Sequence, residues 1–202
     1  MSISDGEHAP RHRRRRTPDE ARLEALASAR RLLLDRGPER VTLKAVADDL
    51  GMSHGNLIHH FGSAEALQSA LMTAMVRDLA EALERAVVQA RSDKGAPRAV
   101  VDIVFDAFDQ GGAGQLAAWI GLSRDPAHLD PVREAVGDLI LAVREKVTAE
   151  GEEAPRHIAS ALLMITLCAF GDAVIGSTLR DVLGRDREAV RRIAARLLPS
   201  FF

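Results

Sequence analysis

The sequence predicts an all-α protein. Apolar residues make up 47% of its 202 residues and charged residues 28%, a balance that is typical of globular proteins and not of disordered chains. Aromatic residues are only 3%, Tyr is absent, and residues that favour helices dominate. Segments with apolar residues at helical spacing alternate with short breaks that contain Gly or Pro. We therefore expect about nine helices.

The first helix is expected to begin at Thr17 and to end before Gly37. Thr17 can cap it, Pro18 suits its first turn, and Glu20 can reach back to complete a capping box. Its leucines and alanines recur on one face, and Gly37 followed by Pro should end it. We interpret this helix as a support for the segment that follows.

Two short helices joined by a glycine turn are expected next, within residues 42–61. Thr42 can cap the first and Ser53 the second, while Gly51 can adopt the positive φ that the turn needs. Ala47 is small enough to let the two helices cross closely, and Leu57 can fill the core between them. This order is typical of a helix-turn-helix. Two ordinary capped helices in an α-rich protein would show the same local signals.

The longer run of residues 41–67 resembles the TetR family of bacterial transcriptional regulators. With the preceding helix, the resemblance covers roughly the first third of the chain. Two positions depart from the family pattern: Ile58 stands where Tyr is usual and Ala64 where Lys is usual. Both family residues typically contact DNA phosphates, so two expected contacts are missing. The residues that carry the resemblance are Thr42, Lys44, Val46, Ala47, Leu50, Gly51, Ser53, Gly55, Leu57, His60, Phe61, Ser63, Glu65 and Leu67.

The second short helix is expected to read DNA in the major groove. Asn56 can offer a paired donor and acceptor to adenine, and His54 can donate to guanine. Gly55 would permit close approach of the backbone. The resemblance gives His60 a supporting or phosphate-contacting role, and the start of the first short helix would supply phosphate anchors. The DNA-binding candidates are Thr42, Lys44, Ser53, His54, Gly55, Asn56, His59 and His60.

The charge distribution agrees in sign with nucleic-acid binding. Residues 1–62 hold eleven Arg and Lys against nine Asp and Glu, whereas the remainder holds sixteen against twenty. Five of the arginines lie in residues 11–16. We expect residues 1–16 to be a disordered Arg-rich arm, which either contacts phosphates or a minor groove or is a solvated tail.

Six further helices are expected after the helix-turn-helix, near residues 63–91, 97–110, 113–124, 130–150, 155–183 and 186–198. The helix expected at residues 155–183 contains the most apolar run of the chain, residues 158–176, which only Asp172 interrupts. Nineteen residues could just span a membrane. Asp172, Ser160, Thr166 and the flanking arginines instead favour a buried interface helix, so we expect no membrane association.

The resemblance implies a second domain that binds a small effector and dimerises through the last two long helices. We place the DNA-binding domain at residues 17–79 and the effector-binding and dimerisation domain at residues 80–202. A buried Asp172 must be paired, hydrogen-bonded or protonated, and could lie at a dimer interface or polarise a ligand pocket. The pocket candidates are Met75, Leu79, Val104, Phe105, Phe108, Trp119, Leu122 and Asp172. The dimer candidates are Ile158, Leu162, Ile165, Cys168, Ala169, Ile193 and Leu197.

Other chemistry finds little support in the sequence. We see no nucleophile–base set, no phosphate-binding glycine loop and no metal-ligand spacing around His54, His59 and His60, so we expect neither an enzyme nor a cofactor. Cys168 lies in an apolar helix and is interpreted as a core residue in a reducing cytoplasm. Asp102, Asp106 and Asp109 share a helix face that is either solvated or receives a cationic group.

These patterns together predict a homodimeric DNA-binding regulator without catalytic activity. The favoured form is a cytoplasmic repressor, associated with the nucleoid when bound to DNA, that a small apolar or amphipathic effector releases from a palindromic operator. A dimeric regulator without an effector, an activator, and a helical enzyme or carrier stay open as alternatives.

Overall fold

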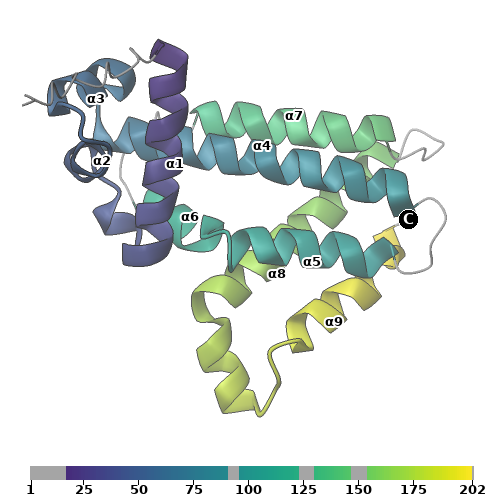
Figure 1. The fold of residues 1–202 in the computed structure, drawn as a ribbon. Coiled ribbons are helices and arrows are strands. Elements are labelled where there is room, and N and C mark those ends of the chain that lie inside the picture. The colour runs from purple at the N-terminus through teal and green to yellow at the C-terminus, as the bar shows by residue number, and fades with distance from the viewer. Residues whose placement is uncertain (1–16, 91–95, 123–129, 147–153, 202) are drawn as a thin grey trace, which may run out of the picture.

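The computed structural model describes residues 17–90, 96–122, 130–146 and 154–201. Over these ranges it holds nine α-helices and no strand, so the all-α prediction is confirmed (Figure 1). The Arg-rich arm and the predicted end of the seventh helix beyond residue 146 lie outside the described residues. The helices are α1 (Pro18–Arg36), α2 (Leu43–Leu50), α3 (His54–Phe61), α4 (Ala64–Ala90), α5 (Ala96–Phe108), α6 (Ala113–Gly121), α7 (Asp130–Lys146), α8 (Ala154–Leu183) and α9 (Ala189–Leu197), with 3-10 turns η1 (Pro38–Arg40) and η3 (Leu198–Phe201).

The expected start and end of α1 are both present. Thr17 Oγ1 accepts a hydrogen bond from the Glu20 backbone N–H, and Glu20 Oε2 accepts one from the Thr17 N–H, which completes the capping box. Gly37 ends the helix at φ 87°, a region that disfavours residues with a side chain. Local sequence therefore determines both ends of this helix.

The helices form a small head and a longer body that share α4 (Figure 1). In the head, α1 crosses the start of α4 and packs against α2 and α3. In the body, α7 runs beside α4 along much of its length, while α5 packs against α4, α8 and α9. The long helix α4 is thus the element that physically connects the two parts.

Two hydrophobic clusters meet on α4. The head cluster contains Leu67, Leu71 and Met75, and the body cluster contains Leu83, with Val76 packed against both. The proposed domain boundary at residue 79 falls in this transition, though α6 contributes its buried face to the head cluster despite following in sequence. The α6 residues of the head cluster are Ala113, Leu116 and Ile120.

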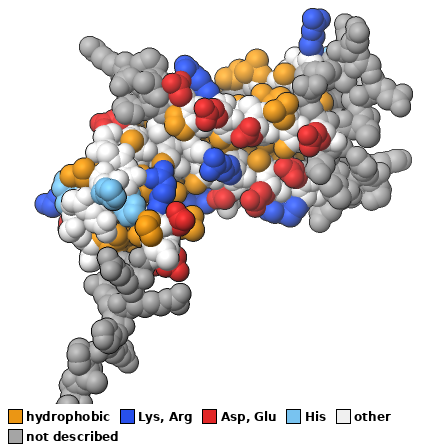
Figure 2. Space-filling view, turned by 90° about the horizontal axis from the view of Figure 1, so that it is seen from above, with side chains coloured by type: hydrophobic (Ala, Val, Ile, Leu, Met, Phe, Trp, Pro, Cys, Tyr) orange, Lys and Arg blue, Asp and Glu red, His pale blue; other side chains and the backbone are white. Residues whose placement is uncertain are grey.

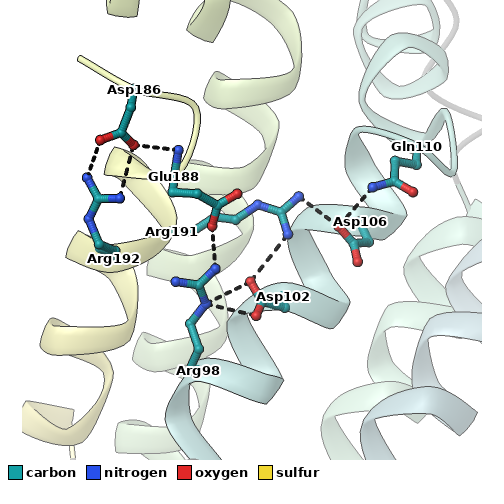
Figure 3. A network of polar contacts seen from close by, with 8 residues as sticks. All are labelled: Arg98, Asp102, Asp106, Gln110, Asp186, Glu188, Arg191 and Arg192. Carbon is teal, nitrogen blue, oxygen red and sulfur yellow. Dashed lines mark hydrogen bonds and ion pairs between the residues drawn. The ribbon is translucent and has the colours of Figure 1, made fainter.

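A network of arginines and carboxylates joins α5 to α9 (Figure 3). The buried Arg191 of α9 donates to Asp102 at 3.3 Å, pairs with Asp106 at 2.7 Å, and lies 5.3 Å from the centroid of the Phe105 ring. Arg98 bonds Asp102 at 2.8 Å and also contacts Glu188. Burial raises the pKa of Asp102, but the hydrogen bonds from the two arginines prevail and hold it below its usual value.

The network shows what the aspartate face of α5 contacts, which the sequence left open. Asp109 also has a partner, Arg187, at 2.9 Å. The aspartate face of α5 therefore receives cationic groups from the chain itself: Arg98 of α5, Arg187 in the turn before α9, and Arg191 of α9. Asp186, where the last helix was expected to begin, accepts the Glu188 N–H at 2.8 Å in the turn that precedes α9, which begins at Ala189.

Helix α8 is long and apolar, but most of its apolar surface is not covered by the chain. Among the described residues it is the one helix whose length and composition could span a membrane, and 22% of its most apolar window is buried. Its side chains at every fourth position, from Leu163 to Leu183, point outward. Ile158, Ile165 and Ala169, expected at a dimer interface, are buried in the body cluster of the single chain.

Candidate nucleic-acid interface and ligand cavity

The caps expected for the helix-turn-helix are formed. Thr42 Oγ1 accepts the Ala45 N–H at 3.1 Å at the start of α2, and Ser53 Oγ accepts the Asn56 N–H at 3.3 Å at the start of α3. Gly51 ends α2 in the left-handed region at φ 59° and ψ 37°. Each hydroxyl keeps its proton for donation to another acceptor, such as a phosphate oxygen.

Helix α3, which the sequence predicts to be the DNA-reading or recognition helix, divides into a buried and an exposed face. Leu57 and Phe61 pack into the head cluster with Ala47, as the sequence indicated. A Cβ at Gly55 would meet no atom of the chain within 4 Å, so its own fold does not require glycine there. His60 is half-buried and Thr42 is intermediate, whereas the other DNA-binding candidates are exposed: Lys44, Ser53, His54, Gly55, Asn56 and His59.

Helix α1 holds α2 through a carboxylate. Asp49 Oδ2 accepts hydrogen bonds from Ser28 Oγ and from Arg31 Nη2, both at 2.6 Å. These bonds, from Ser28 first and Arg31 second, lower the pKa of Asp49. Ser28 is fully buried, so its hydroxyl is satisfied where an apolar residue would otherwise be expected. Asp49 and its partners carried no signal in the sequence that would single them out.

Helix α1 also holds the end of α3. Arg22 Nη1 donates to the backbone oxygen of His60 at 2.7 Å, and its guanidinium carbon lies 4.5 Å from the centroid of the Phe61 ring. Arg30 ties the same helix to Asp78 of α4 at 2.6 Å. The recognition helix is therefore fixed at its C-terminal end as well as through its buried face.

The exposed end of the head carries side chains that suit an acidic partner. His side chains gather there, and acidic side chains extend along the body (Figure 2). Ile58, at the position where the family usually has Tyr, is 45% exposed on α3, and Ala64 starts α4. Neither side chain can donate a hydrogen bond to a phosphate. Among the described residues, no three His, Cys, Asp or Glu side chains are grouped so as to hold a metal ion.

An apolar cavity of about 270 Å³ lies in the body between α4, α5, α6, α7 and α8. Three of the sequence-predicted pocket residues, Met75, Leu79 and Phe108, line it. Helix α7 supplies further lining that the sequence did not single out, because a valine, a leucine and an isoleucine in an amphipathic helix look like ordinary core residues. The α7 lining residues are Val136, Leu139 and Ile140.

The other predicted pocket residues lie elsewhere. Val104 and Phe105 are buried in the body cluster, with Phe105 turned toward α9 and Arg191. Trp119 is 42% exposed and Leu122 82% exposed, because the buried face of α6 is the one that carries Leu116 and Ile120. These four residues therefore do not line this cavity.

Asp172 is likewise not in the cavity, and its charge is compensated within α8. It forms an ion pair with Arg180, two turns further along the same helix, and both side chains are largely buried. A Cβ at Gly176, midway between them, would overlap the Asp172 carboxylate. The absence of a side chain at Gly176 leaves room on the helix surface for the Asp172 and Arg180 side chains to meet. The spacing of Asp172, Gly176 and Arg180 by fours was the sequence signal for this pair.

The Asp172–Arg180 pair borders a groove of about 680 Å³ between α8 and α9. Of the predicted dimer residues, Cys168 and Ile193 line this groove, and Leu197 is exposed on the same helix as Ile193. Leu162 lines the apolar cavity instead. Burial, followed by the nearby Asp172 charge, raises the pKa of the Cys168 thiol, which makes it a poor nucleophile.

A capped helix-turn-helix on a helical body with a partly open apolar cavity defines the class of two-part helix-turn-helix proteins. Residues 25–71 match the model of bacterial regulatory proteins of the tetR family. The regulator BetI of Paraburkholderia phytofirmans is 33% identical over 93 residues, which cover 46% of this chain and 47% of that protein. The match to the family model therefore covers the helix-turn-helix head and not the body. The chain matches about half the length of this curated relative.

Solved structures share the fold over most of the chain. A transcriptional regulator of Streptomyces coelicolor A3(2), SCO7518, superposes with a TM-score of 0.62 at 17% identity, covering 88% of this chain and 98% of that one. A transcriptional regulator of Saccharomonospora viridis in complex with choline gives 0.58 at 17% identity, covering 90% and 96%. At these identities the likeness concerns the fold alone.

Proposed function

We propose that this protein is a dimeric, sequence-specific DNA-binding transcriptional regulator, most simply a repressor that a small molecule releases from its operator. The observation that carries the proposal is the recognition helix α3. It is capped by Ser53, held by Arg22 and packed through Leu57, and its remaining polar side chains point into solvent in a TetR-type head. A helix anchored this firmly, with an unused polar face, suits insertion into the major groove.

Within this proposal the exposed residues divide into two groups. Asn56 and His54, in the first turn of α3, are positioned to contact base edges, as N-terminal residues of recognition helices do. Thr42 and Lys44 at the start of α2, with Ser53, contact phosphates and set the register of the head on the duplex. His59 and the half-buried His60 lie in the last turn of α3 and support it or contact phosphate. Gly55 lets the helix backbone approach DNA.

The dimer is proposed to form through α8 and α9. Leu163, Leu167, Ile175, Leu179 and Leu183 form a ridge with a spacing of four, and all are exposed. Gly171 sits in the middle of that ridge, where a Cβ would meet no atom of the chain. Glycine inside a helix costs about 1 kcal/mol relative to alanine. The close approach of a second copy gives a reason for that cost, and Ile193 and Leu197 extend the same surface on α9.

A two-fold dimer of this kind would present two recognition helices to one face of DNA. Half-sites would then lie about 34–36 Å apart, one duplex turn, and the operator would be palindromic. The apolar cavity would receive the effector, and a ligand that binds better to a form with wrongly spaced heads would release the DNA. In the cell we place the protein in the cytoplasm, and at the nucleoid when it is bound to DNA.

Selection of bound sequences from random duplex DNA tests the proposal directly. The full chain should enrich a palindrome whose half-sites are one turn apart, and a variant with Asn56→Ala should lose preference at one symmetric pair of positions. Enrichment of no sequence would overturn the proposed function. Enrichment of a single unrepeated half-site would overturn its dimeric form.

Three alternatives make different predictions in the same assay. A regulator without an effector would bind the selected DNA equally well in the presence of any cavity ligand. An activator would bind the same DNA and raise transcription from a promoter placed beside it. A helical enzyme or carrier would enrich no DNA sequence.

A further inference from the structure

The lining of the apolar cavity restricts the chemistry of its ligand. Of the fourteen described residues around it, only Thr166 has a polar side chain and none is charged. The nearby carboxylates of α5 are turned toward α9, where arginines hold them. Among the described residues, therefore, no group is placed to neutralise a charge inside the cavity, and a buried unpaired charge is strongly disfavoured.

A quaternary ammonium ligand is poorly matched to this cavity. Such cations are recognised by cages of aromatic rings, often with a carboxylate. Here Phe108 is the one aromatic residue among the described lining residues, and its ring already makes a perpendicular contact with Phe170, with centroids 6.5 Å apart. In this respect the cavity differs from what choline, the ligand of the Saccharomonospora viridis protein, would require.

The size and shape of the cavity set a second limit. A volume of about 270 Å³ is small for a ligand site, and at ~30 Å³ per water-sized group it holds roughly nine non-hydrogen atoms. Met72 and Met75 line it on α4, and their flexible side chains can adapt to a hydrocarbon chain. In the single chain the lining residues Leu163 and Thr166 of α8 and Val136 of α7 are exposed, so the cavity meets solvent between these two helices.

We propose that the cavity binds an uncharged aliphatic molecule of about eight to ten carbons, with a hydroxyl or carbonyl group at Thr166. The hydrocarbon part replaces water or empty space beside leucine, methionine and valine side chains, and burial of apolar surface stabilises the complex. Release of DNA by this ligand would rest on the proposed function, whereas binding of the ligand to the protein is independent of that function. Binding is therefore measured without DNA.

The test measures binding of 1-octanol and of choline to the full-length protein. Calorimetric titration gives the affinity and stoichiometry, and thermal unfolding gives the change in the unfolding midpoint. 1-Octanol should bind at one site per chain and raise the unfolding midpoint, and choline should do neither. Ala107→Leu on α5 and Val136→Phe on α7 fill the cavity from two sides and should each weaken 1-octanol binding at least tenfold. Ala118→Leu, on α6 outside the cavity, is the matched control and should bind as the native protein does.

The polar end of the ligand is tested separately. Thr166→Val removes the one hydroxyl of the lining while keeping its shape, and should weaken 1-octanol binding about two- to tenfold, the value of one net hydrogen bond. Binding of choline would overturn the assignment. So would equal binding of 1-octanol to the cavity-filled variants and the control, because the alcohol would then be adsorbed on the exposed face of α8.

The same protein then distinguishes this assignment from the proposed function. If the native chain binds a selected DNA site but no 1-octanol, the ligand assignment fails and the regulator stands. If it binds 1-octanol at the cavity but no DNA sequence, the regulator fails and the ligand assignment stands.

Discussion

Arg22 of α1 donates a hydrogen bond to the backbone oxygen of His60, 2.7 Å away, in the last turn of the recognition helix. Carbonyl groups in the last turn of a helix have no partner within the helix, and the helix dipole places negative charge there. A cation from α1 satisfies both conditions. The guanidinium also stacks on the Phe61 ring, so it fixes the helix end in direction as well as position.

Replacement of Arg22 should weaken DNA binding without changing its salt dependence. Arg22→Lys keeps the charge but loses the planar group that stacks and donates, so affinity should fall about threefold, and Arg22→Ala about tenfold. Because Lys at this position leaves the phosphate contacts intact, the slope of log affinity against log salt should equal that of the native protein. Fluorescence anisotropy over a salt series measures both quantities. Arg30→Lys, which alters an exposed pair with Asp78, is the control.

Substitutions at Asn56 and Lys44 should separate base reading from phosphate contact. Asn56→Ala should cost about 1–3 kcal/mol at the preferred site and relax preference at one symmetric pair of positions. Lys44→Gln should weaken all sequences alike and reduce the salt slope by about 0.9 for each phosphate that the variant no longer neutralises. Titration of matched and mismatched duplexes measures both effects. Identical behaviour of the two variants would show that this division of roles is incorrect.

The pair of Asp102 with Arg98 and Arg191 should make stability dependent on pH at the acidic end. The folded-state pKa of Asp102 lies below its unfolded value of about 3.9, so its stabilising contribution is complete above that pH and is lost as pH falls through the folded-state pKa. Asp102→Asn should lower the free energy of unfolding at pH 7 by about 1–2 kcal/mol, since the site is partly exposed. Urea unfolding at pH 7 and pH 3 should show a smaller pH effect in the variant.

Asp109→Asn is the matched control for that experiment. Asp109 lies on the same helix and also pairs with an arginine, but the pair is exposed, so its removal should change stability by less than about 0.5 kcal/mol. Equal losses of stability in the two variants would mean that the interaction between Arg191 and Asp102 adds nothing beyond an ordinary surface ion pair.

A charge on the outer ridge of α8 should separate the proposed dimer into folded monomers. Ile175 is 52% exposed, so Ile175→Glu should leave the helical content unchanged and place a charge where a second copy would pack. Sedimentation velocity should give half the native mass at micromolar concentration. Leu23→Glu, at a leucine of α1 that is 68% exposed, should retain the native mass. An unchanged mass for Ile175→Glu would place the dimer interface elsewhere.

The head could be predicted from the sequence because its signals are local. Thr17, Thr42 and Ser53 each cap the helix that follows them, and Gly51 adopts the positive φ that its turn needs. None of these depends on a distant part of the chain. The polar ties from Ser28, Arg31 and Arg22 were not predictable, since each joins residues at least 18 positions apart.

The body was harder to predict for a different physical reason. Helix α8 is apolar on nearly all sides, so hydrophobic spacing does not reveal which side faces the chain. Ile158, Ile165 and Ala169, expected at the dimer interface, lie on the side that packs into the chain's own core. Trp119 was a pocket candidate, yet its helix buries Leu116 and leaves Trp119 42% exposed. Packing against distant parts of the chain determines which face of such a helix is buried, and the spacing of apolar residues in one sequence does not reveal it.

Helix α4 is a long, continuous connection between the cavity and the head. Its 27 residues extend for about 40 Å, with cavity residues Met75 and Leu79 near its middle and the head attached at its first turns. The hydrogen bonds and ion pairs from α1 to α2, α3 and α4 hold the head together as one rigid unit at the start of α4. A tilt of about 5° imposed at Leu79 would displace the start of α4 by about 2 Å, and in a two-fold dimer the two displacements add. If the proposed dimer binds half-sites about 34–36 Å apart, a rotation too small to disturb any helix would change the spacing of its two heads enough to weaken that binding.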